Sequence, residues 1–184
     1  MHPLAKILLT VEGLWSFGSG LFLPIFAIFS EQVGGDITDA GIAAALFLAV
    51  TALLEYPAGY LIDWLGEKWF LVADYLFEAG IFFAYIFVDD KYELFFLQIL
   101  LGAANAFGDP SWESLYDRVS PKRGRGSYWA RSHLFLGLST AVGILIGSFL
   151  AVKYGFSVVF LFGGFMSIVA AFVTMRYVSD RGVK

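Results

Sequence analysis

The sequence lacks cysteine altogether and contains only two histidines in 184 residues. Without cysteine the chain cannot form disulfides, thiolate metal sites or a thiol nucleophile. Two histidines alone make a poor set of metal ligands, so we predict neither a metal site nor a cofactor. The motifs G-x-x-x-x-G-K-[ST], H-E-x-x-H and G-x-S-x-G are absent as well. These absences favour a protein that is not an enzyme.

Charged side chains are scarce, at 15% of the residues where a soluble domain carries about 25%. Hydrophobic residues make up 59% of the chain, and the mean hydropathy is +0.74. The apolar residues gather in runs long enough to cross a bilayer, which takes roughly 20 residues. We predict six such spans, at residues 7–29, 39–62, 69–88, 94–117, 128–151 and 156–177. The chain is therefore predicted to be an all-α integral membrane protein.

The first run is predicted to be a retained span and not a cleaved signal peptide, because Glu12 interrupts it and no A-x-A site follows. Six spans place both chain ends on one side of the membrane. That side would carry ten basic residues: Lys6, Lys68, Arg118, Lys122, Arg123, Arg125, Arg131, Arg176, Arg181 and Lys184. The other side would carry only Lys91 and Lys153. Because basic loops stay in the cytoplasm, we expect both termini to be cytoplasmic, in a plasma or bacterial inner membrane.

The short stretch GYLIDWLGEK, residues 59–68, places charges and glycines between the second and third spans. Glycine allows close approach of helices and a positive φ, so a polar hairpin turn is one interpretation. The full pattern, with Gly59, Asp63, Gly66 and Lys68, resembles the loop between the second and third spans of major facilitator superfamily transporters. In that interpretation Asp63 accepts hydrogen bonds at the positive end of another helix and the loop takes part in gating.

Two further stretches extend the resemblance to the whole chain. Glu55-Tyr-Pro-Ala-Gly59 is similar to an E-x-P-x-G segment of one branch of the family, and Ser114-Leu-Tyr-Asp117 is similar to its A-L-x-Y-D segment. There are also departures, which bear on proton coupling and antiport. Trp64 and Glu67 replace the usual arginines of the loop, Gln98 stands where many proton-coupled members have arginine, and Gly143-x-x-x-Gly147 lacks a following proline.

The resemblance implies the six-helix amino-terminal half of a transporter that normally has twelve helices. It implies a single domain over residues 1–184, built as two inverted three-helix repeats at about 7–88 and 94–177. It also implies a second six-helix half as partner, either in a homodimer or as a separate chain. Spans one and four would then be equivalent, as would two and five, and three and six.

Polar residues inside the spans are candidates for lining a cavity, since charge in hydrocarbon costs several kcal/mol. Span one carries Glu12 and Ser16, and span four carries Asn105 and Asp109, each set at helical spacing. Asn105 lies roughly 16 Å inside its span, near the bilayer midplane. We expect these four residues to line a substrate cavity. Hydrogen bonding between helices is the alternative for Asn105 and Asp109, and snorkelling to the inner face is the alternative for Glu12. Span six has no charge and is expected to be peripheral.

Asp74 and Glu78 lie one turn apart on span three, and two neighbouring buried carboxylates rarely both ionise. Glu55 of span two could join them, either sharing a proton or meeting an arginine. A proton site is the functional interpretation of this group, and a polar network that packs helices is the structural one. Glu113 and Arg131 are expected to form an ion pair at the cytoplasmic rim.

Two hypotheses of function follow. In the first, the chain is half of a secondary transporter that moves a small solute, of a class the sequence leaves open, by alternating access. In the second, it is a non-transporting membrane scaffold or a truncated remnant of a twelve-helix transporter. The basic residues of 118–131 are explained by topology and anionic lipid, so we expect membrane lipid and no nucleic acid as a partner.

Overall fold

The computed structural model describes residues 2–178, so Arg181 and Lys184 of the predicted basic side lie outside the described residues. The elements are α1 (Pro3–Phe22), η1 (Leu23–Ile25), α2 (Phe26–Gln32), α3 (Ile37–Leu65), α4 (Glu67–Ala84), η2 (Tyr85–Phe87), α5 (Lys91–Arg118), α6 (Arg125–Tyr154) and α7 (Phe156–Tyr177). No strand occurs within the described range. The prediction of an all-helical chain is confirmed.

Five helical segments of residues 2–178 are long and apolar enough to cross a membrane. They are Pro3–Gln32, Ile37–Leu65, Glu67–Phe87, Arg125–Tyr154 and Phe156–Tyr177. The predicted fourth span corresponds to α5, whose 28 residues are also long enough. It does not reach the same apolarity because it carries amides and carboxylates. Two of these, Gln98 and Asn105, are buried against neighbouring helices and away from lipid.

Local signals in the sequence start and stop these helices. Asp36 begins α3 by accepting hydrogen bonds from the backbone N–H groups of Thr38 and Asp39, and these bonds lower the pKa of Asp36. Asp90 begins α5 in the same way. Gly66 separates α3 from α4 and Gly155 separates α6 from α7, with φ of 96° and 83°. A single residue at positive φ turns the chain between helices, and glycine adopts that conformation without strain.

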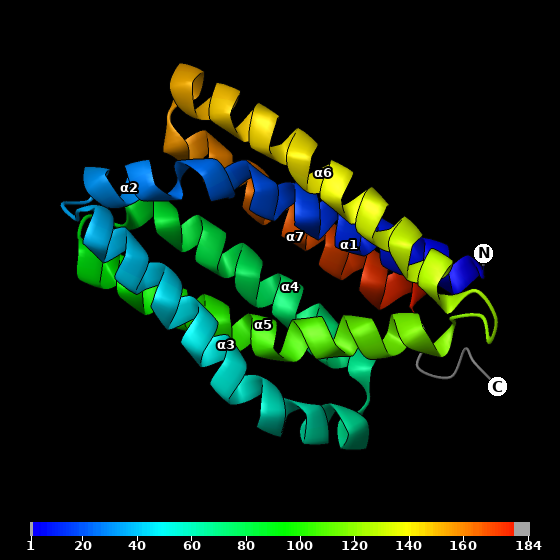
Figure 1. The fold of residues 1–184 in the computed structure, drawn as a ribbon. Coiled ribbons are helices and arrows are strands. Elements are labelled where there is room, and N and C mark those ends of the chain that lie inside the picture. Colours follow the sequence, from blue (N-terminus) through cyan, green and yellow to red (C-terminus); the bar gives the residue numbers. More distant parts are fainter. Residues whose placement is uncertain (1, 179–184) are drawn as a thin grey trace.

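The helices form two groups of three, seen side by side in Figure 1. In one group α1 packs between α6 and α7, and in the other α5 packs between α3 and α4. The groups meet where α4 packs along α7. Helices α3 and α6 therefore lie at the two edges of the bundle, and much of their apolar surface is exposed.

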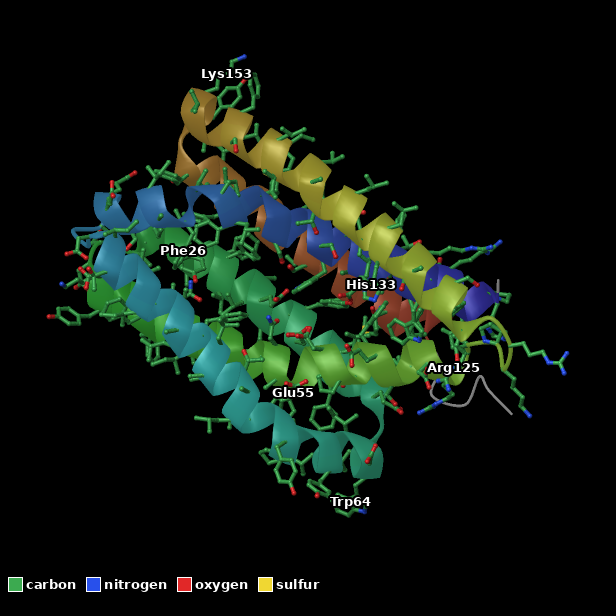
Figure 2. The ribbon with its side chains drawn as sticks, viewed as in Figure 1. Phe26, Glu55, Trp64, Arg125, His133 and Lys153 are labelled. Atoms are coloured by element: carbon green, nitrogen blue, oxygen red, sulfur yellow. The ribbon has the colours of Figure 1, made fainter. Side chains whose placement is uncertain are left out.

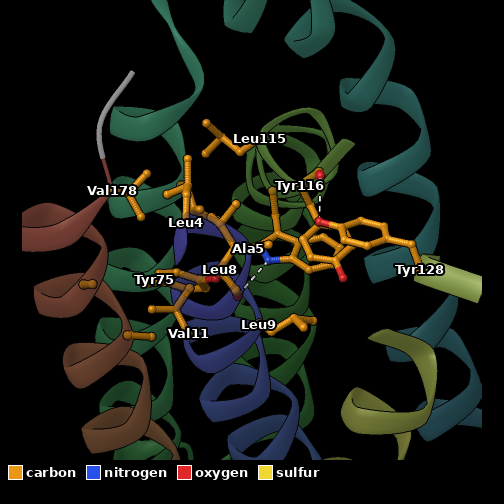
Figure 3. Close-up of a cluster of buried hydrophobic side chains, with 14 residues drawn as sticks. Leu4, Ala5, Leu8, Leu9, Val11, Tyr75, Leu115, Tyr116, Tyr128 and Val178 are labelled. Carbon is orange, nitrogen blue, oxygen red and sulfur yellow. Dashed lines mark hydrogen bonds between the residues drawn. The ribbon is translucent and has the colours of Figure 1, made fainter. Parts of the chain in front are cut away.

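The core divides into two buried clusters, one toward each end of the bundle. Figure 3 shows the first, in which Trp112 Nε1 donates to the backbone carbonyl of Leu8 at 3.0 Å and Tyr128 donates to that of Tyr116 at 3.3 Å. The second cluster is built on the rings of Phe22, Phe29, Tyr85 and Phe160, packed mostly edge to face.

The two clusters correspond to two ends of the bundle with different connections. Pro3, the 119–124 loop and Tyr177 lie at one end, and the 33–36 and 88–90 turns lie at the other with Gly155 (Figure 1). Near the second end Lys91 pairs with Asp39 at 3.1 Å, and this hydrogen-bonded ion pair raises the pKa of Lys91. The side of the membrane that each end faces stays a prediction.

Glycines allow the closest helix crossings. On α6, a Cβ added at Gly143 or Gly147 would overlap the backbone of α1 at Phe17 or Leu21. On α5, a Cβ added at Gly102 would lie 2.5 Å from the carbonyl oxygen of Phe47 on α3. In a bilayer, helices associate through such backbone contact because lipid tails are as apolar as the side chains.

We therefore expect Gly147→Ala to separate α1 from α6 and to lower stability by about 1–3 kcal/mol. Gly137→Ala is the matched control, because a Cβ there meets nothing within 4 Å. Unfolding of the purified variants in mixed micelles by sodium dodecyl sulfate measures the difference. Equal stability of the two variants would contradict the crossing described here.

Candidate substrate cavity

A cavity of about 300 Å³ opens where α1, α3, α4 and α5 converge. Its lining residues are Trp15, Ser19, Phe22, Leu23, Phe26, Ala44, Phe47, Glu78, Phe82, Gln98, Leu101 and Asn105. Figure 2 labels Phe26, which belongs to this lining. The volume is at the lower limit of small-molecule sites, and the lining is mostly apolar, with five aromatic residues and four polar ones, as such sites are.

Helical spacing explains which polar groups reach the cavity. On α1, Trp15, Ser19 and Phe22 lie four and three residues apart and so share one face. Gln98 and Asn105 lie two turns apart on α5 and face the same space. Glu78 reaches the cavity from α4, the helix that contacts α5 on one side and α7 on the other.

Three polar atoms around this cavity are buried without a hydrogen bond from the described part of the chain. They are Trp15 Nε1, Glu78 Oε2 and Asn105 Oδ1. Buried polar atoms of folded proteins are nearly always paired, so a cluster of unpaired ones calls for an explanation. The side chains of Trp15 and Glu78 interact with each other, which leaves Asn105 Oδ1 as the position that suits a polar ligand or water.

The other predicted cavity residues lie around this space and not in its lining. Glu12 is buried and accepts a hydrogen bond from Tyr75 Oη at 3.0 Å, which joins α1 to α4. Ser16 is buried one turn further along α1. Asp109 is exposed on α5, near Glu113 and Glu55. Figure 2 shows Glu55 on α3, beside α5.

The residues of the predicted polar network are not gathered at one point. Asp74 and Glu78 are both buried on α4, but they line two different cavities. Glu55 is exposed and has no hydrogen bond to either of them. An arginine does not pair with any of these three acids among residues 2–178, where the ion pairs are Lys91–Asp39, Arg118–Glu67 and Arg125–Asp117.

The predicted ion pair of Glu113 with Arg131 is wrong. Both side chains are exposed, and neither has an opposite charge within 4.0 Å in the described range. The physical reason is that α5 and α6 are not neighbours along their length, because α1 packs against α6. At their ends the two helices meet instead through stacked rings, with Tyr116 on Tyr128 at 4.6 Å.

The predicted loop at residues 59–68 is helical except at Gly66, because α3 continues to Leu65 and α4 begins at Glu67. One contact in this stretch was not predicted from the sequence. Glu67 is buried and forms an ion pair with Arg118, and it accepts a hydrogen bond from Ser114 Oγ at 3.0 Å. The signal was present: Ser114 and Arg118 lie four residues apart on one helix and so share a face. The other loop residues are Gly59, which is half-buried, Asp63, which is exposed, the turn residue Gly66, and Lys68, which lies over the Trp69 ring at 5.2 Å.

The sequence model of one protein family matches residues 8–184, and that family is the Major Facilitator Superfamily. An uncharacterized MFS-type transporter of Methanocaldococcus jannaschii is 29% identical over 163 residues, which are 89% of this chain and 42% of that relative. The multidrug resistance protein MdtG of Escherichia fergusonii is 27% identical over 147 residues, 78% of this chain and 36% of the relative. MdtG of Salmonella typhimurium is 25% identical over 146 residues, which are 77% of this chain and 36% of that relative. The chain thus spans about two fifths of the length of these relatives.

The hydrogen bond between Tyr75 and Glu12 gives a test of the polar interior. Tyr75→Phe would leave the Glu12 carboxyl buried without its donor, and we expect a loss of about 1–3 kcal/mol in stability. Tyr85→Phe is the matched control, because Tyr85 Oη is also buried but has no partner in the described structure. The same detergent unfolding measures both. A loss at Tyr85→Phe as large as that at Tyr75→Phe would contradict this account.

Proposed function

We propose that this chain, which belongs to the Major Facilitator Superfamily, forms one six-helix half of a secondary transporter that moves a small solute across the membrane by alternating access. The observation that carries the proposal is the cavity between α1 and α5, where unpaired polar atoms lie inside an otherwise apolar bundle. Polar side chains within a membrane are costly and mark substrate or ion pathways. Transport, and not catalysis, is the role that fits this lining.

The neighbour relations of the helices support two equivalent repeats. Exchanging α1 with α5, α3 with α6 and α4 with α7 turns the α1–α6 contact into the α5–α3 contact. The same exchange turns α1–α7 into α5–α4 and leaves α4–α7 unchanged. The turns at Gly66 and Gly155 occupy corresponding places. Inverted repeats of three helices are the known plan of each half in this superfamily.

A second six-helix half would complete the cavity. Without that second half, only the helices of this chain would separate lipid from Glu12, Asn105 and Asp109. The partner surface would be built from α1, α3, α5 and α6, with α4 and α7 outside. The second half could be another copy of the chain, a separate chain or a further part of the same polypeptide. The two halves would be related by an axis along the membrane normal.

Orientation follows from charge. Described basic residues gather at the end that holds Pro3 and the 119–124 loop, which supports a cytoplasmic location for that end. The exposed apolar faces of α3 and α6 contact lipid wherever the partner half does not cover them. The protein would thus be a multi-pass protein of the plasma or inner membrane.

Asp63 lies two residues before the end of α3. The side chain of Asp63 is exposed, whereas Glu67 forms an ion pair with Arg118 of the same chain. We propose that Asp63 meets the positive end of a helix in the partner half and stabilises one gating state.

The cavity can be tested by introducing single cysteines into this cysteine-free chain. In the assembled transporter, Asn105→Cys and Asp109→Cys should react with membrane-impermeant thiol reagents, because water reaches these positions. Phe165→Cys and Ile168→Cys are the controls, since these α7 side chains are exposed on the apolar outer surface and would face lipid. Labelling rates measured by mass spectrometry should differ at least tenfold. Equal protection at all four positions would count against a water-filled cavity.

The gating role of the loop gives a second test. Asp63→Asn keeps the shape of the side chain and removes its charge, so we expect transport to fall severalfold while membrane insertion is unchanged. Asp89→Asn, an exposed acid at the other end of the bundle, is the matched control. Solute uptake into or efflux from vesicles is the measurement. Normal transport by Asp63→Asn would mean that the loop is a turn and nothing more, as in a scaffold.

A further inference from the structure

A second cavity, also of about 300 Å³, lies on the surface along the contact of α4 with α5. It shares no lining residue with the candidate substrate cavity. The residues that line this outer groove are Phe70, Ala73, Asp74, Phe77, Leu100, Ala103, Ala104 and Phe107. Seven of the eight are apolar and one is an acid, which is an unusual combination on a surface that faces hydrocarbon.

Asp74 is held at the groove by close packing and not by hydrogen bonds. The residue is only 5% exposed, and its Oδ1 atom is buried without a partner in the described chain. The carboxyl lies against Gly108 of α5, where an added Cβ would overlap it. Glycine at this one position makes room for the carboxyl between the two helices. The Asp74 side chain thus lines the groove and has no hydrogen-bond partner in the described part of the chain.

The charges around Asp74 are all of one sign. The ionisable groups that interact with it are Glu78, Asp109 and Glu12, and none of the three ion pairs of the described residues includes it. Acids this close together in a place that excludes water repel one another when charged, so a carboxylate at Asp74 is stabilised only when a cation pairs with it. A charged hydrogen-bond donor would satisfy the unpaired oxygen.

The walls of the groove suit an apolar body attached to such a cation. Phe70 and Phe107 stack at 5.4 Å with their planes 12° apart, and Phe77 lies on the same side of α4. Ala103 and Ala104 are small and leave the space between the helices open. Aromatic faces also attract ammonium groups directly.

The depth of Asp74 along α4 favours a free amine over a lipid headgroup as the ligand. Asp74 lies seven residues after the start of α4, so it is about 10 Å inside the helix end. The headgroup of a phospholipid stays at the interface, whereas a single-chain amine can move to this depth with its charge paired. The groove thus fits a molecule whose only polar group is the amine.

We propose that the outer groove is a lateral binding site for amphipathic amines that reach it from the bilayer. The ammonium group donates to the Asp74 carboxylate, and the apolar chain lies against the three phenylalanine rings. The site does not depend on the substrate cavity or on a second half, so its failure would leave the transport proposal untouched.

The test uses the chain in nanodiscs, with dodecylamine as probe and dodecanol as its neutral match. We expect saturable binding of dodecylamine, after subtraction of empty nanodiscs, and at least tenfold weaker binding of dodecanol. Asp74→Asn should reduce amine binding to the level of dodecanol. Asp89→Asn, the same chemical change at an exposed turn, should bind dodecylamine within twofold of the unaltered chain.

A groove-filling variant keeps the proposal open to refutation if Asp74→Asn does not fold. Ala104→Phe leaves the carboxyl in place and fills the space beside it, so it should abolish binding of dodecylamine. Unchanged amine binding in Asp74→Asn, or in Ala104→Phe, would overturn the proposal. Equal binding of dodecylamine and dodecanol would overturn it as well, because recognition would then be hydrophobic only.

Discussion

The rest of this structure depends on one constraint: acidic side chains that are buried without a basic partner must be kept away from lipid. Glu12, Asp74 and Glu78 lie inside the bundle, on α1 and α4, and the described ion pairs all lie near its ends. Desolvation of such groups costs several kcal/mol, so each must be held away from lipid by neighbouring helices. The helix order achieves this by placing α4 between α5 and α7, and the hydrogen bond from Tyr75 to Glu12 joins α4 to α1. The cavity and the outer groove are the two places where this shielding is incomplete.

Shielding of this kind requires helices that approach closely, and glycine permits this because it has no side chain. Gly143 and Gly147 bring α6 onto α1, and Gly102 brings α5 against α3. Gly108 has a different role, because the group that packs against it is the Asp74 carboxyl and not the backbone of another helix. Small residues thus set both the spacing of the helices and the position of a charge. Backbone contact and carboxyl placement are coupled because both depend on the same rotation of α5 about its axis.

The ends of the bundle are held by interactions of another kind. Stacked rings of Trp112, Tyr116 and Tyr128 join α5 to α6 at one end, and Glu67 pairs with Arg118 beside them. At the other end Lys91 joins α5 to α3 through Asp39. Such contacts at membrane depth near the interface can be made and broken at moderate cost, unlike the packing at the middle of the bundle.

The sequence alone predicted an all-helical chain with six segments of membrane-spanning length, because a run of about 20 apolar residues has one stable form in a bilayer. The turns at Gly66 and Gly155 and the helix starts at Asp36 and Asp90 depend on neighbours within a few residues, but of these four features only the turn region around Gly66 was predicted. The sequence did not determine which polar residues of α5 are buried, nor that Glu113 and Arg131 stay apart while Glu67 meets Arg118. Only the tertiary structure decided that Asp74 and Glu78, one turn apart, line two different cavities. These outcomes depend on the rotation and tilt of each helix, which are set by contacts between residues far apart in the chain.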